Sequence, residues 1–149
     1  MGSLTNLIYH VVFSTKHREA LIREEIQLEL HSYLGAVIRK NQGIVLEIGG
    51  TEDHVHILLK IRAMMSLSDM MREIKSDSSR WLNKIKNFNG TFGWQNGYGG
   101  FTVSASQVER VRAYVKNQKK HHQKNNFENE FLQFLEHNQL EYNPDYLWN

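Results

Sequence analysis

Two histidines separated by a single residue, His54 and His56, have the types and the spacing to do chemistry. Imidazole nitrogens bind divalent metal ions, and two of them on one rigid element can hold one ion. The residues that alternate with them are apolar, as on a half-buried strand: Val55, Ile57, Leu59 and Ile61. On a strand the two imidazoles project from the opposite face, about 6.5 to 7 Å apart along the chain. The pair therefore predicts the beginning of a metal site.

The alternative is a pair of surface histidines without a function. Two phosphate-handling patterns are excluded, because Leu58 stands where a third alternating histidine would be and no His-x-Thr or His-x-Ser occurs. A third ligand must come from another part of the chain.

Tyr114, Gln118 and His121 recur at helical spacing and form one polar stripe of a predicted helix. A tyrosine hydroxyl, with a pKa near ~10, becomes a nucleophile when a metal ion or cationic surroundings favour the phenolate. The carbonyl oxygen of Gln118 could complete the site of His54 and His56 and leave open positions for phosphate oxygens. This set predicts metal-assisted phosphoryl transfer with Tyr114 as covalent nucleophile. The alternative is an exposed basic helix with Tyr114 packed at its edge.

Strands and helices alternate along the chain in an order that indicates an α+β fold. Strands are predicted at residues 7–14, 44–48, 54–61 and 101–104, and helices at 21–40, 66–85, 106–122 and from 126. Gly49 and Gly50 are expected to end the second strand, and Ser106 with Glu109 is expected to form a capping box. The order β-α-β-β-α-β is that of a ferredoxin-like antiparallel sheet with helices on one face. The later helices are expected to carry the nucleophile, and residues 1–149 are expected to form a single domain.

Composition excludes several classes of protein. The chain has no cysteine, so it contains neither disulfides nor a thiolate zinc site. Hydrophobic residues make up 40% and charged residues 23%, which is typical of a globular protein. The absence of a long apolar run or a secretory signal predicts a cytoplasmic protein without a membrane segment.

The charge is distributed unevenly along the chain. Residues 125–149 contain five acidic residues and neither Lys nor Arg, although the whole chain has a net charge of +2. A basic body with an acidic tail suggests a polyanionic partner for the body, and the alternative is a mixed, solvated surface.

The order and spacing of several motifs resemble a known family. They occupy residues 9–16, 49–56, 75–81, 94–99 and 114–122. A histidine–hydrophobe–histidine strand followed by a Tyr-x-x-x-Gln helix is similar to the HUH single-tyrosine transposases of the smallest bacterial insertion sequences. This IS200-like superfamily includes the REP-associated tyrosine transposases.

The resemblance implies an enzyme that cleaves single-stranded DNA at hairpin-marked ends and rejoins it. It implies that Tyr114 forms a 5′-phosphotyrosine and releases a 3′-hydroxyl, and that His54, His56 and Gln118 bind Mg²⁺ or Mn²⁺. It also implies a homodimer, in which the tyrosine helix of one subunit often completes the histidine pair of the other.

Basic side chains on two predicted helices are the candidates for contacts with the DNA backbone. They are Lys75, Arg80, Arg112 and Lys116. A solvated helix face is the alternative explanation for all four.

Two other functions fit the same residues. One is a hairpin-DNA-binding protein that derives from a transposase and has no catalytic role. The other is a metal-dependent phosphoesterase that uses water, for which the Tyr114 hydroxyl would be dispensable.

Overall fold

The computed structural model describes residues 2–122, 126–145 and 147. Its strands are β1 (Ile8–Ser14), β2 (Ile44–Gly50), β3 (His54–Lys60) and β4 (Gly99–Thr102). Its α-helices are α1 (Glu24–Lys40), α2 (Leu67–Ile85), α3 (Val108–Lys116), α4 (Gln118–His122) and α5 (Phe127–His137). Two short 3₁₀ helices, η1 (Lys16–Arg18) and η2 (Ala105–Gln107), precede α1 and α3.

The four strands form one antiparallel sheet in the order β2-β3-β1-β4. β3 is central, because it pairs with β2 on one side and with β1 on the other. This order, with helical connections after β1 and β3, confirms the predicted α+β, ferredoxin-like fold.

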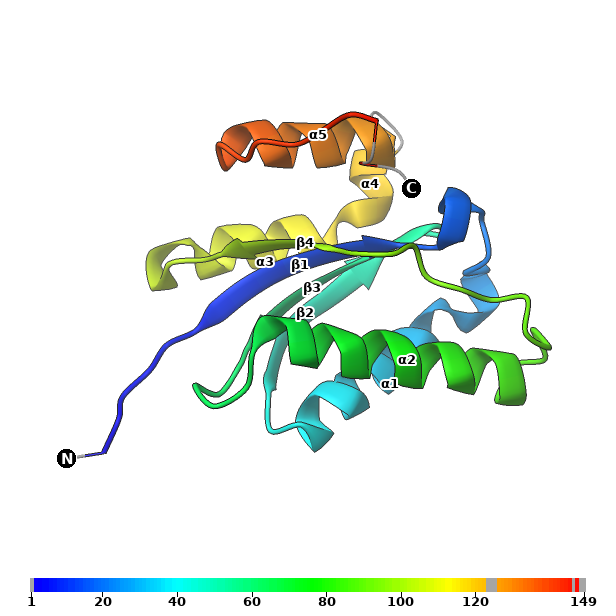
Figure 1. Ribbon diagram of the computed structural model, residues 1–149, viewed down its shortest axis with the longest axis horizontal. Helices are drawn as coiled ribbons and strands as arrows, with labels where there is room; N and C mark the ends of the chain where they lie inside the picture. The colour runs from blue at the N-terminus through cyan, green and yellow to red at the C-terminus, as the bar shows by residue number, and fades with distance from the viewer. Residues whose placement is uncertain (1, 123–125, 146, 148–149) are drawn as a thin grey trace.

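The main core lies between the sheet and helices α1 and α2, which cover one face (Figure 1). Val55, Ile57 and Leu59 of β3 point into it and are fully buried. The side chain of Ser66 accepts a hydrogen bond of 3.0 Å from the Asp69 amide and thereby caps α2.

The opposite face of the sheet is covered by α3, α4 and α5 (Figure 1). Smaller apolar clusters hold this layer, one around Val12 and Phe101 with α5 and another around Leu58 with Val115 of α3. β3 is therefore buried on both faces, and the prediction of a half-buried strand was wrong. Alternation along one strand does not reveal whether a later helix will cover its second face.

Several predicted boundaries also differ. β2 continues through Gly49 and Gly50, because their backbone groups pair with β3 at His56 and Val55. α1 begins at Glu24 rather than at residue 21, and β4 begins at Gly99 rather than at residue 101.

The helix predicted over residues 106–122 is broken into separate pieces. Ser106 lies in η2, and no side chain caps the start of α3, so the predicted capping box was wrong. α3 ends at Lys116, and α4 begins two residues later, after Asn117. By contrast, α5 begins where predicted, with the Asn126 side chain accepting a hydrogen bond from the Asn129 amide at 2.9 Å.

Across the described residues, none of the helices has both the length and the apolar character that crossing a bilayer requires.

Candidate active site

β3 directs His54 and His56 away from the main core and toward α3 and α5. Both imidazoles are fully buried, and their ring centroids lie 5.1 Å apart. Because β3 is hydrogen-bonded on both sides, the separation of the two rings is set by the most constrained strand of the sheet.

The turn before β3 fixes the orientation of the His54 ring. Nδ1 lies 2.7 Å from the carboxylate of Asp53, to which the Thr51 hydroxyl also donates at 3.0 Å. An acidic acceptor at Nδ1 places the ring proton there and leaves the lone pair on Nε2. Nε2 points to the Gln118 carbonyl oxygen at 3.2 Å.

His56 is held by a second buried histidine. Its Nδ1 lies 2.8 Å from Nε2 of His10 on the neighbouring strand β1. Burial and the adjacent His56 lower the pKa of His10 to about 3, against a smaller opposite effect of Glu130. His10 is therefore a neutral ring that supports His56, as outer partners of metal-binding histidines do.

Glu130 of α5 is the site residue that was missing from the sequence prediction, which placed it in an acidic tail. It is only 4% exposed, and its Oε1 lies 2.9 Å from Nε2 of His56 and 3.8 Å from Nε2 of His54. The available signal was its spacing, since Phe127 and Phe134 stand three residues before it and four after it. An acidic residue at those positions lies on the buried face of a helix.

The break after α3 turns Gln118 toward the histidines. Its Nε2 donates to the Tyr114 carbonyl at 3.1 Å, so its own carbonyl oxygen faces His54. Gln118 is 1% exposed. The structure thus brings it to the histidine pair, although not as part of one continuous helix with Tyr114.

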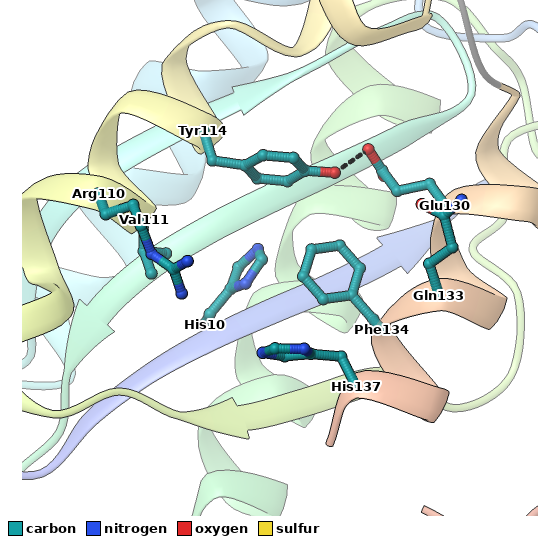
Figure 2. A pocket seen from close by; sticks show the side chains of 8 residues that line it. All are labelled: His10, Arg110, Val111, Tyr114, Glu130, Gln133, Phe134 and His137. Atoms are coloured by element: carbon teal, nitrogen blue, oxygen red, sulfur yellow. Dashed lines mark hydrogen bonds between the residues drawn. The ribbon is translucent and has the colours of Figure 1, made fainter. Parts of the chain in front are cut away.

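Tyr114 reaches the same point from α3. Its hydroxyl donates a hydrogen bond to Glu130, as Figure 2 shows. The pKa of Tyr114 is raised above its ordinary value. Burial is the largest cause, and the hydrogen bond to Glu130 and the charge of its carboxylate act in the same direction. The ring of His121 packs against the Tyr114 ring, with centroids 4.5 Å apart.

The donor atoms of these side chains suit a divalent cation. One atom from each of His54, His56 and Glu130 lies within 4.8 Å of the others, and all three residues are buried. The Gln118 oxygen adjoins them. Two imidazole nitrogens with carboxylate and amide oxygens form a ligand set found around divalent ions, so the residues fit a metal site.

Gly49 determines how closely α3 can approach the histidines. It pairs with His56 in the sheet, and a Cβ atom at this position would lie 1.9 Å from the carbonyl oxygen of Val115. Val115 directly follows Tyr114, so the bare backbone of Gly49 allows the tyrosine helix to rest on the sheet beside His56.

The four predicted DNA contacts fall on two separate layers. Lys75 and Arg80 belong to α2, on the face of the sheet away from Tyr114, whereas Arg112 and Lys116 belong to α3 (Figure 1). Arg80 is exposed near Asp77, and Arg112 lies 3.9 Å from Glu109. The structure does not gather the four into one patch.

Lys75 binds the protein's own backbone. Its ammonium donates to the carbonyl oxygens of Gln95 and Gly97, each at 2.7 Å, and burial lowers its pKa.

We expect Lys75→Met to lower the free energy of unfolding by about 2 kcal/mol, because two charge-assisted bonds are lost. Urea denaturation would measure this loss of stability. The control is Lys84→Met, which changes an exposed lysine and should alter the free energy of unfolding by less than about 0.5 kcal/mol. Unchanged stability combined with weaker DNA binding would instead assign Lys75 to the DNA.

Comparison with known proteins gives a consistent result. A family profile described as "Transposase IS200 like" matches residues 3–118. The transposase for insertion sequence element IS200 of Salmonella typhimurium is 32% identical over 123 residues, covering 76% of this chain and 77% of that protein. The ISDra2 transposase TnpA of Deinococcus radiodurans is 25% identical over 123 residues, covering 78% of this chain and 87% of that protein.

Two solved structures share the fold. A Deinococcus radiodurans R1 chain assigned as a transposase aligns with a TM-score of 0.64 and 24% identity, covering 79% of this chain and 95% of that one. A REP-associated tyrosine transposase bound to a REP hairpin aligns with a TM-score of 0.57 and 14% identity, covering 77% of this chain and 67% of that one. On the profile match and the identity to the Salmonella protein, the chain belongs to the IS200-like transposase family.

Proposed function

We propose that this transposase cleaves and rejoins single-stranded DNA at hairpin-marked ends, with Tyr114 as nucleophile and a 5′-phosphotyrosine intermediate. The observation that carries the proposal is the convergence of the Tyr114 hydroxyl with two buried histidines and Glu130. Membership of a transposase family supports a DNA-cleaving enzyme.

We propose that His54, His56 and Gln118 hold the divalent ion, Mg²⁺ or Mn²⁺, and that Glu130 joins them as a ligand. When bound, the ion supplies Lewis-acid polarisation of the scissile phosphate. Asp53 and His10 hold the two imidazoles in the orientations described above, so that the ring nitrogens face the site before DNA binds.

The residues of the chain also account for the transfer of the proton. As the Tyr114 oxygen bonds to phosphorus, its proton passes to Glu130, which already accepts a hydrogen bond from it. The bond from phosphorus to the 3′ oxygen breaks, and that oxygen takes up a proton from solvent water and leaves as a 3′-hydroxyl. A 3′-hydroxyl can later attack the phosphotyrosine and restore a phosphodiester without an external energy source.

For the DNA partner we propose hairpins, because a structural neighbour of this chain is bound to a REP hairpin. Arg112 and Lys116 lie on the tyrosine helix and are the proposed contacts with the DNA backbone on this layer, and Arg80 would serve a strand that passes α2. Lys75, whose ammonium is bonded to two backbone carbonyl oxygens, is left with the structural role described above. The proposed homodimer follows from the resemblance, and the proposed cytoplasmic location follows from the sequence composition. Tyr114 already faces the histidines of its own chain, which favours cleavage within one subunit.

The test is a search for a covalent protein–DNA adduct. Purified protein is incubated with single-stranded hairpin DNA from the flanks of its gene in Mg²⁺, Mn²⁺ or EDTA, and the modified peptide is identified by mass spectrometry. A metal-dependent adduct on Tyr114 is expected. Tight hairpin binding without an adduct in either metal would favour a non-catalytic binding protein.

The role of Glu130 as a metal ligand predicts the effect of Glu130→Gln. The amide keeps an oxygen but loses the charge, so half-maximal adduct formation should require about 10- to 100-fold more metal. The measurement is a titration of adduct yield with Mn²⁺. Glu136→Gln, which changes an exposed carboxylate of the same helix, should leave the curve unchanged. An unaltered curve for Glu130→Gln would remove Glu130 from the ligand set.

A further inference from the structure

A cavity of about 420 Å³ opens between α3 and α5, directly beside Tyr114. Its lining includes His10, Arg110, Val111, Tyr114, Phe134 and His137 (Figure 2). This volume is in the range of about 300 to 1,000 Å³ typical of small-ligand sites. Tyr114 and Glu130 border both the cavity and the proposed metal site, so a molecule inside it would adjoin the reacting hydroxyl.

The inner end of the cavity combines aromatic surface with a buried polar ring. Phe134 packs against both His10 and Tyr114, with ring centroids 5.1 Å and 5.5 Å away. His10 is 3% exposed, and its Nε2 is engaged by Nδ1 of His56. If His56 presents the lone pair of Nε2 to the metal, its proton is on Nδ1 and is donated to His10. The proton of His10 is then on its own Nδ1, where it is a hydrogen-bond donor for an occupant.

The mouth of the cavity carries positive charge. Arg110 is exposed and makes neither a hydrogen bond nor an ion pair with any residue that the structure describes. Figure 2 shows its guanidinium on the α3 side, with His137 of α5 on the other side. A planar cation at the entrance suits a phosphate group.

On the basis of the proposed cleavage reaction, we propose that this cavity receives the nucleobase of a nucleotide adjoining the scissile phosphate. An aromatic wall stacks on the face of a base, a buried donor meets its polar edge, and a cationic mouth accompanies its phosphate. Pockets that hold bases extruded from a strand combine the same features. A base bound here would hold the neighbouring phosphate against Tyr114.

The test uses the strand that the wild-type protein cuts and compares it with copies that carry an abasic site at each nucleotide flanking the cut. Binding to Tyr114→Phe protein in Mg²⁺ is measured by fluorescence anisotropy, because this variant lacks only the nucleophilic hydroxyl. One of the two abasic strands should bind about tenfold more weakly or worse. Equal binding of both abasic strands and the intact strand would overturn the proposal.

A variant that fills the cavity makes the test specific. Val111→Phe, in the same background, should bind the intact strand as weakly as the abasic one, and the abasic site should then have no further effect. Phe131→Leu changes an aromatic residue of α5 that lies outside the cavity and should keep the full difference. An abasic effect that persists in Val111→Phe would place the base elsewhere. These outcomes are separate from the adduct assay, which alone decides whether DNA is cleaved.

Discussion

Tyr114→Phe should abolish formation of the covalent adduct and lower strand cleavage on the order of 10⁴-fold or more. In the proposed mechanism the hydroxyl is the nucleophile, and the nearest described side chain that could replace it, Glu130, is engaged with His56. Hairpin binding should persist, because the ring and its packing against Phe134 and His121 are retained. The measurement is single-turnover cleavage of end-labelled DNA at saturating metal.

The chain contains a matched control for this change. Tyr33 is also bonded to a carboxylate, because its hydroxyl donates to Asp77 at 2.6 Å. Burial raises the pKa of Tyr33 to about 12. It lies in the α1–α2 layer, away from the histidines. Tyr33→Phe should therefore leave cleavage unchanged. Cleavage by Tyr114→Phe at the wild-type rate would indicate a phosphoesterase that uses water.

Gly49→Ala should lower cleavage about 100-fold while the fold persists. The new Cβ would meet the Val115 carbonyl at 1.9 Å, whereas ordinary contact begins at 3.4 Å. α3 would have to move off the sheet by roughly the difference between these two distances. A displacement near 1 Å of a reacting group can cost about 100-fold in rate. Overpacking between α3 and β2 should lower the free energy of unfolding by about 1–3 kcal/mol. The loss is limited because the main core on the other face of the sheet should be unaffected.

Gly93→Ala is the control, because a Cβ there would meet only the Lys16 side chain, at 3.6 Å and beyond. Its cleavage rate and unfolding free energy should stay close to those of the wild type. If Gly49→Ala cleaved DNA normally, the position of α3 against β2 would not determine the placement of the nucleophile.

Local patterns were sufficient to predict much of the fold and part of the candidate site. Alternation along β3 placed His54 and His56 on one face, because side chains on a strand point to opposite faces in turn. Helical periodicity located α2, and Ser66 and Asn126 are caps because each accepts a hydrogen bond from an amide three residues later. These features depend only on neighbours in the sequence.

What the sequence could not reveal depends on contacts between distant segments. Glu130 is a site residue because α5 packs over β3, 74 residues away from His56 in the chain. Likewise, β2 extends through Gly49 because this residue pairs with β3. The absence of a side chain at Gly49 leaves room for α3 to pack directly on the strand. At Ser106 the chain forms the 3₁₀ turn η2 in place of the predicted capping box, and local propensity is too weak to decide between the two.

The division of the site between a central strand and a separate helical layer has a thermodynamic consequence. Amides of β3 are bonded on both sides and should exchange with deuterium only on global unfolding. Among the described residues, α5 is joined to the sheet only by side-chain contacts, in the cluster around Val12 and Phe101 and through Glu130, and so we expect it to detach in a partial opening of lower free energy. Heating should therefore remove Glu130 from the histidines while the sheet is still intact. Enzymatic activity would then be lost reversibly at a temperature below the midpoint of thermal unfolding.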